Sequence, residues 1–156
     1  MASWAELHDS APKIADEGRM LLFRTGAGEG LLTTVAGDRL PRTHPVNVGI
    51  VDERLLVFVQ AGSAKALDLA ADGRYALHAH QDPAVPHEFL LRGRAALITD
   101  PDMRDRAVAS WPFDATDGYT LFELGIEHAI FGERGDPDAW PPRYTSWRAP
   151  AADAIG

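Results

Sequence analysis

The chain of 156 residues contains no cysteine. This absence excludes disulfide bonds, catalysis by a thiol and zinc sites built on thiolates. The chain also lacks a run of about 18 apolar residues, so no transmembrane helix is expected. No basic stretch followed by an apolar one stands at the N-terminus, so no secretory signal is expected and the cytoplasm is the expected location.

Positive charge is scarce, because 15 lysines and arginines stand against 23 acidic residues and give a net charge of −8. An acidic chain does not favour the phosphate backbone, so no nucleic-acid partner is expected. Any anionic ligand must then be held by a local cluster of cations. Lysine is especially rare: Lys13 and Lys65 are the two lysines among the 15 basic residues.

Several catalytic patterns are missing. No Gly-x-Ser-x-Gly elbow is present, which excludes a hydrolase of the α/β type. His78 and His80 form a His-x-His pair, but no carboxylate is placed convincingly near it, and we expect no metal site. The alternating glycines of residues 25–30 follow a helix and precede a strand, whereas a dinucleotide-binding loop follows a strand, so we expect a plain loop.

Hydrophobic residues make up 46% of the chain, which supports one folded domain over residues 1–156. Two helices are expected within residues 1–25, the first with a capping box at Ser3 and Glu6, and further helices over residues 63–71 and 101–110. Strands are expected over residues 31–35, 40–51, 55–59, 74–80, 87–99, 119–131 and 144–148. The short connections between them predict a mainly β fold, a small antiparallel barrel of the Greek-key type.

The side-chain pattern also predicts which faces are buried. In the second helix the core candidates are Ile14, Met20, Leu21 and Phe23. In the later strands the expected core faces consist of Phe89, Leu91, Ala95 and Leu97, and of Phe122, Leu124, Ile126 and Ile130. Pro41 and Pro45 lack the N–H that a ladder needs, so the strand over residues 40–51 is expected at an edge or at a bulge.

The clearest chemical signal is a turn followed by a helix start. Gly62, Ser63 and Lys65 bring a small residue, a hydroxyl group and a cation to this point. Free N–H groups and the positive end of the helix dipole favour an anion there. Upstream, Arg42 and His44 form a polar and basic patch within a strand. This combination predicts a phosphorylated cofactor lying across a barrel.

Two other groups of residues leave alternatives open. Arg92 and Arg94 share one face of their strand and fit either a surface or interface salt bridge or a site for an acidic substrate. Trp111 and Trp147 lie late in the chain and fit either core and dimer packing or a cover over the cofactor.

Six segments occur in an order that resembles the FMN-binding split-barrel family, also called the pyridoxamine 5′-phosphate oxidase-like family. They are GLLTTV, PRTHPV, GSAK, RYALHAH, LLRGRAALITDPD and YTLFELGIEHAIF, within residues 10–132. Residues 133–156 lie beyond this match and are expected to form a loop and a short strand. The resemblance implies a six-stranded barrel that pairs into a homodimer, with the cofactor in the groove between the two copies.

The resemblance also implies which residues contact the cofactor. Ser63 and Lys65 would hold the terminal phosphate, and Trp111 or Trp147 of the second copy would cover the ring. The expected cofactor-binding residues are Arg42, Thr43, His44, Pro45, Val46, Phe58, Val59, Gln60, Ser63, Lys65, Trp111 and Trp147.

The function that the resemblance implies is an FMN-dependent oxidoreductase acting on a small organic molecule. No catalytic residue is assigned, because the flavin carries the redox chemistry. The alternatives are an F420-dependent reductase of the same fold and a protein that binds flavin or haem without turnover. The ending from Arg148 to Pro150 departs from the arginine-rich end of the founding oxidase, so the same reaction is not expected.

Overall fold

The computed structural model describes residues 1–151 and contains seven antiparallel strands. The strands are β1 (Gly28–Thr34), β2 (Arg42–Val51), β3 (Arg54–Gln60), β4 (Arg74–Ala79), β5 (Glu88–Leu97), β6 (Tyr119–Glu133) and β7 (Arg143–Arg148). Their order in the sheet is β3-β2-β1-β4-β5-β6-β7, and an additional pairing of β3 with β6 closes six of them into a barrel. The succession β3-β2-β1-β4 is a Greek key, which confirms the predicted fold class.

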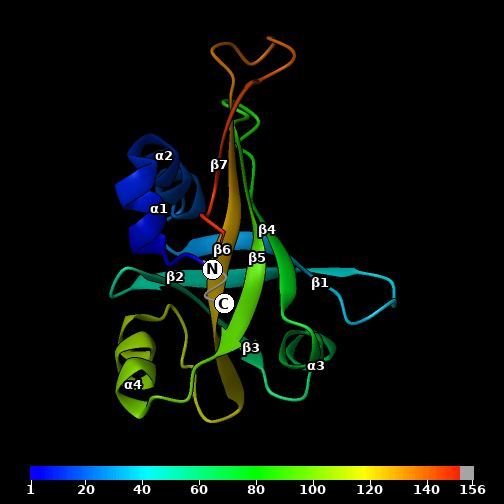
Figure 1. Cartoon of the computed structure of the whole chain (residues 1–156). Helices are drawn as coiled ribbons and strands as arrows, with labels where there is room; N and C mark the ends of the chain where they lie inside the picture. The colour runs from blue at the N-terminus through cyan, green and yellow to red at the C-terminus, as the bar shows by residue number, and fades with distance from the viewer. Residues whose placement is uncertain (152–156) are drawn as a thin grey trace.

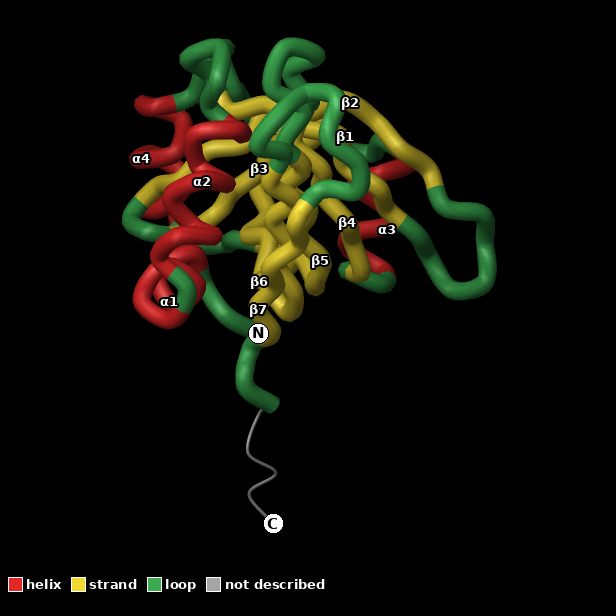
Figure 2. Tube along the Cα trace, turned by 90° about the horizontal axis from the view of Figure 1, so that it is seen from above, coloured by secondary structure: helices red, strands yellow, loops and turns green. Residues whose placement is uncertain are grey.

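Four helices surround this barrel: α1 (Trp4–Ser10), α2 (Pro12–Leu22), α3 (Ala64–Ala71) and α4 (Pro101–Ser110). Figure 1 shows α1 and α2 beside the upper part of the barrel and α4 below them. Viewed from above, α3 lies across the strands from these three helices (Figure 2). No helix within residues 1–151 has both the length and the apolar character needed to cross a membrane.

Local sequence rules account for the helix starts. Ser3 and Glu6 form the expected capping box, in which the Glu6 carboxylate accepts from the N–H of Ser3 at 2.6 Å. Asp100 caps α4 by accepting from the N–H of Asp102 at 3.0 Å, and Pro101 occupies the first turn. Both features satisfy N–H groups that have no acceptor within the helix.

The buried side chains form two clusters. The larger one fills the barrel and includes Leu32, Leu77 and Phe131. The second lies between the barrel wall and α4, where Phe58 and Trp111 meet edge to face with ring centroids 4.8 Å apart.

The structure overturns some of the expected side-chain positions. Met20 is 70% exposed, so it is not a core residue. Leu97 is 56% exposed, because β5 ends there and Ile98 packs against the second cluster instead. Ile130 is half-buried, whereas Ala129 and Phe131 belong to the core. The reason is an irregularity in the β5–β6 ladder that reverses the alternation in β6.

The plain loop expected over residues 25–30 is wrong in its second half, because β1 begins at Gly28. Gly28 pairs with Val48, and Gly30 pairs with Val46. A Cβ atom on Gly28 would overlap the carbonyl oxygen of Val48. Glycine is therefore required for the close approach of the two strands, and here it marks a strand rather than a loop.

Candidate functional site

The start of α3 has the geometry of an anion site. The hydroxyl of Ser63 accepts a hydrogen bond from the N–H of Ala66 at 3.3 Å, which confirms Ser63 as the N-cap. Gly62 has φ +75°, a conformation that suits glycine and turns the chain from β3 into the helix. The N–H groups of Ala64 and Lys65 lie in the first turn, where no acceptor within the helix can reach them. These donors are available to a ligand.

Lys65 adds a positive charge to this helix start. Its side chain is half-buried, and it forms no ion pair with any of residues 1–151. The other lysine, Lys13, lies 3.5 Å from the Glu133 carboxylate. Of the two lysines, Lys13 is thus paired with an acidic residue, whereas Lys65 remains without an ion pair among residues 1–151.

Arg42 comes to the same helix from the first residue of β2. Its Nε donates to the Asp68 carboxylate at 2.8 Å, and the hydroxyl of Thr34 donates to the same oxygen at 2.9 Å. Asp68 is 3% exposed, whereas the side chain of Arg42 is 37% exposed. Asp68 follows Lys65 by three residues, a spacing that puts both on neighbouring parts of one helix face. Arg42 thus contacts α3 about one helical turn after Lys65, and we refer to these two cations as the basic group.

The first half of β2 has a free edge beside this group. β2 pairs with β1 from Arg42 to Val48, but it pairs with β3 through Val48–Val51 alone. Pro45 sits in the stretch that lacks β3 as a neighbour, which confirms the edge position expected from the prolines. The backbone groups on this side of residues 42–47 have no strand partner and can face a ligand.

The side chains of the other expected cofactor-binding residues on β2 point in different directions. Thr43 meets Thr33 across the ladder, with their hydroxyl oxygens 2.8 Å apart. Pro45 is exposed and His44 is half-buried. Val46 packs against the core cluster, so its side chain is directed into the barrel.

On β3, the side chains of Phe58 and Val59 are buried in the two core clusters. A ligand can therefore meet these two residues through their backbone. Gln60 is exposed at the end of β3, and its carbonyl accepts from the N–H of Ser63 at 3.1 Å. Gln60 thus lies beside the helix start.

The two tryptophans lie elsewhere in the same chain. Trp111 is 8% exposed and packs against Gly49 and, edge to face, against Phe58. It also lines a hollow of about 470 Å³ with Phe23 and the glycines of the β1 start. Trp147 lies on β7 opposite Ala129 and packs against the main core. The structure does not bring either ring to Lys65 within one chain.

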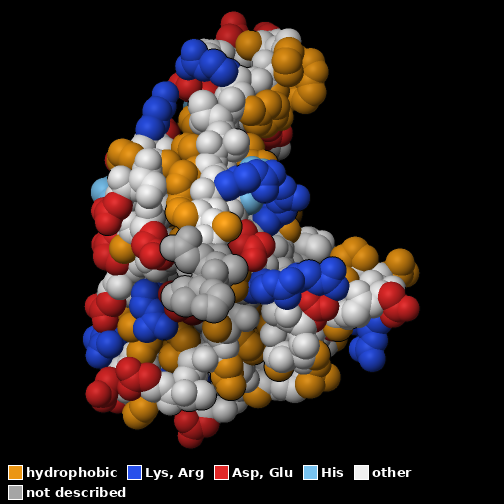
Figure 3. Space-filling model, viewed as in Figure 1, with side chains coloured by type: hydrophobic (Ala, Val, Ile, Leu, Met, Phe, Trp, Pro, Cys, Tyr) orange, Lys and Arg blue, Asp and Glu red, His pale blue; other side chains and the backbone are white. Residues whose placement is uncertain are grey.

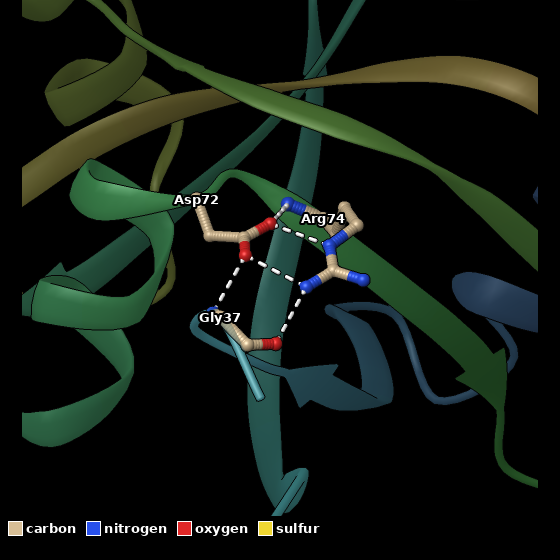
Figure 4. Close-up of polar contacts among 3 residues, drawn as sticks. All are labelled: Gly37, Asp72 and Arg74. Atoms are coloured by element: carbon tan, nitrogen blue, oxygen red, sulfur yellow. Dashed lines mark hydrogen bonds and ion pairs between the residues drawn. The ribbon is translucent and has the colours of Figure 1, made fainter. Parts of the chain in front are cut away.

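Two acidic residues that the sequence analysis missed organise the surroundings of α3. One is Asp68, which anchors Arg42. The other is Asp72, the C-cap, whose carboxylate accepts from Arg74 at 2.6 and 2.8 Å and from the N–H of Gly37 at 2.9 Å (Figure 4). The hydrogen bonds from Arg74 and then from Gly37 hold the pKa of Asp72 well below its usual value. Asp68 could have been noticed in the sequence, because it is an acidic residue beside the apolar Leu69 on the face of the helix that is buried.

We then compared the chain with known proteins. No family model and no curated protein sequence matches it significantly. Solved structures do match. A haem-binding protein from Mycobacterium smegmatis has a TM-score of 0.63 at 17% identity, over 86% of this chain and 57% of that protein. An FMN-binding protein related to pyridoxamine 5′-phosphate oxidase from Nostoc punctiforme has a TM-score of 0.58 at 15% identity, over 92% of this chain and 96% of that protein.

The chain has the split-barrel fold of the pyridoxamine 5′-phosphate oxidase-like proteins. A haem storage protein from Vibrio cholerae has the same split barrel, with a TM-score of 0.57 at 12% identity over 75% of this chain and 89% of that protein. The described part of this split barrel contains no group of three or more histidine and acidic side chains arranged to hold a metal ion.

Proposed function

We propose that this split barrel binds FMN and acts as a flavin-dependent oxidoreductase on a small organic molecule. The observation that carries the proposal is the start of α3, where Ser63, Lys65 and two free N–H groups lie about one helical turn before Asp68, the residue that binds Arg42. A phosphate group needs such hydrogen-bond donors and positive charge. Arg42 uses Nε for Asp68, which leaves its two terminal nitrogens to contact a phosphate oxygen.

The free edge of β2 supports the placement of the ring. Ring nitrogens and carbonyl oxygens require a few fixed donors and acceptors, which the backbone of residues 42–47 offers. FMN would supply the hydride or electron transfer when bound, and the protein supplies position and charge. Arg42 and Lys65 hold the phosphate, Gln60 lies at the rim of the site, and no side chain needs to act as acid or base.

We further propose that two copies pair through the outer face of the sheet. A row of side chains, apolar apart from one histidine, runs there across five adjacent strands. The row runs Pro45, Leu31, His78, Leu90 and Ile130, each opposite the next in register. Leu31 is 37% exposed although its side chain is large and apolar. A second copy would bury this row and bring its own late residues, Trp111 or Trp147 among them, toward the cofactor.

The same anion site would also accept the phosphate-containing cofactor F420, which is the first alternative. A second alternative is haem binding without turnover. It is favoured by the likeness to haem-binding and haem storage proteins, and its candidate axial ligands are His44 and His80. Both histidines are half-buried.

A visible absorption spectrum of the purified protein, followed by titration with FMN, F420 and haem, tests these proposals. The FMN proposal expects a flavin spectrum with one FMN per chain and bleaching of the bound flavin by NADH or NADPH. Binding of F420 without binding of FMN would refute the FMN proposal and support the first alternative. A Soret band that is lost in His44→Ala or His80→Ala would support the haem alternative. Binding of none of the three would refute all of them.

A further inference from the structure

A second basic cluster lies on the outer face of the sheet. Arg92 on β5 stands directly opposite His128 on β6, and His128 stands directly opposite Arg148 on β7. The three side chains share a hollow of about 320 Å³ with Arg74, Tyr75 and Glu127. Figure 3 shows basic side chains (blue) and histidine (pale blue) together beside a concave part of this surface.

This cluster is built at a β-bulge. Arg92 pairs with His128 but Gly93 pairs with Ile126, so Glu127 is an extra residue in β6. The extra residue lines the same hollow as His128, although neighbours in a regular strand face opposite sides. A Cβ on Gly93 would overlap the carbonyl oxygen of Gly125, so glycine is needed opposite the bulge. Bulges that redirect a side chain are enriched next to functional sites.

The hydrogen bonds in the cluster leave an excess of donors. Nη2 of Arg92 lies 2.6 Å from Nδ1 of His128. Because the guanidinium stays charged and can only donate, Nδ1 accepts and the imidazole carries its proton on Nε2. Burial, followed by the charges of Arg148 and Arg92, lowers the pKa of His128 and favours this neutral form.

The arginines in this row also lack acidic partners. Among residues 1–151, no carboxylate lies within 4.0 Å of Arg92 or Arg148, whereas Arg74 is paired with Asp72. Glu127 lines the hollow but forms no ion pair with these two arginines. Arg92 and Arg148 flank His128 from the strands on either side of β6, so two positive charges line one hollow. The row therefore presents two guanidinium groups without a carboxylate partner and, at Nε2 of His128, an N–H donor with no acceptor among the described residues.

We propose that this hollow binds a small organic or inorganic anion through a carboxylate or phosphate group, contacted by Arg92, His128 and Arg148. Two guanidinium groups around one neutral donor match the several acceptor oxygens of such a group. The site is separate from the proposed cofactor site. Arg74, on its wall, binds the residue that ends α3, whereas Lys65 lies at the start of that helix, which is about 12 Å long for eight residues.

Isothermal titration with inorganic phosphate and with succinate tests the proposal. The measurements use Lys65→Ala protein without flavin, so that the start of α3 does not contribute and the outcome does not depend on FMN binding. We expect one anion per chain. Arg92→Gln and Arg148→Gln should each weaken binding at least about tenfold, the loss typical of one charge-assisted hydrogen bond. Glu127→Gln should tighten it, because a negative charge leaves the hollow.

Arg94→Gln is the matched control. Arg94 is exposed two residues further along β5 and lines a different hollow, beside Met1 and Glu123. It should change the affinity less than about twofold. If neither probe binds, or if Arg92→Gln and Arg148→Gln bind both probes as before, the proposal is wrong. If these two variants instead convert a dimer into monomers while anion binding is unchanged, the cluster is a protein interface and the proposal is likewise wrong.

Discussion

Arg42 and Asp68 join the first residue of β2 to the middle of α3 through a hydrogen bond of 2.8 Å from Nε to the carboxylate. The pair is asymmetric, because Asp68 is 3% exposed and the Arg42 side chain 37% exposed. The buried carboxylate requires its partners, whereas the guanidinium is already half in water. This contact keeps the arginine on α3 about one helical turn from Lys65, and it makes the stability of the fold depend on a residue of the proposed cofactor site.

The asymmetry predicts unequal effects of two substitutions. Arg42→Ala leaves the buried Asp68 carboxylate with Thr34 as its remaining side-chain donor and should lower the free energy of unfolding by about 2–3 kcal/mol. Asp68→Asn leaves a neutral buried amide and a solvated guanidinium, and should cost about 1 kcal/mol. Urea denaturation measures both. Arg39→Ala, an exposed arginine in the neighbouring turn, should be neutral. Equal losses of unfolding free energy for Arg42→Ala and Asp68→Asn would contradict the conclusion that Asp68 is the partner that depends on the contact.

Gly93 provides a test of the bulge. Gly93→Ala introduces a methyl group that would overlap the carbonyl oxygen of Gly125, so β5 or β6 must shift. We expect a loss of about 3 kcal/mol or a failure to fold. Gly135→Ala is the control, because a Cβ there meets no atom within 4 Å. Thermal unfolding compares the two variants. A melting temperature of Gly93→Ala equal to that of the parent would mean that the bulge is not as described.

The Asp72 carboxylate should make stability depend on pH in the acid range. Its folded-state pKa lies below the ordinary value of 3.8, mainly because Arg74 donates to it. The contact therefore stabilises the fold above pH 3.8, and this contribution is lost as the pH falls through the folded-state pKa. Asp72→Asn should be less stable than the parent at pH 7, and the difference should narrow below pH 3.8. Urea denaturation between pH 7 and pH 2.5 measures this difference in the free energy of unfolding.

Asp105 supplies the comparison for this pH series. It is exposed on α4 and forms no side-chain hydrogen bond or ion pair within residues 1–151. Asp105→Asn should follow the parent at every pH. A gap between Asp72→Asn and the parent that stays constant down to pH 2.5 would show that the charge of Asp72 is not what stabilises the fold.

The proposed pairing of two copies predicts a mass of twice the 16.9 kDa chain in sedimentation velocity. Leu90→Arg places a charge in the middle of the apolar row on the outer sheet face, where burial without a partner is costly. It should give a monomer that still folds, because Leu90 is half-buried and lies outside both core clusters. Leu97→Arg, at an exposed leucine near α4, should stay dimeric. A monomeric parent protein would contradict the proposal that two copies share the cofactor groove.

The elements that follow from local rules could be predicted from the sequence. The bounds of α4 and the caps at Ser3 and Ser63 depend on residues within one turn of each other. The edge position of Pro45 follows from its missing N–H. The expectation of a closed six-stranded barrel came from the resemblance of ordered segments to a family, and the order of the strands was not predicted, since spacing alone does not choose which strands pair.

The features that were missed depend on contacts between distant residues. Arg42 and Asp68 are 26 residues apart, and a strand pattern cannot show that an arginine faces a buried carboxylate. The bulge at Glu127 moved Ile130 out of the expected core face, because one extra residue reverses the alternation. Gly93 was the available signal, since glycine within a strand often marks such an irregularity.

The most direct test of the central proposal compares FMN with riboflavin, which lacks the phosphate, in the parent protein and in Lys65→Ala. Quenching of flavin fluorescence gives the four dissociation constants, and Lys13→Ala is the control for loss of a lysine. We expect the parent protein to prefer FMN by at least tenfold, and we expect Lys65→Ala to weaken FMN binding by about 1.5–3 kcal/mol while leaving riboflavin binding unchanged. Equal affinities for FMN and riboflavin in the parent, or an FMN affinity unchanged by Lys65→Ala, would contradict a phosphate site at the start of α3.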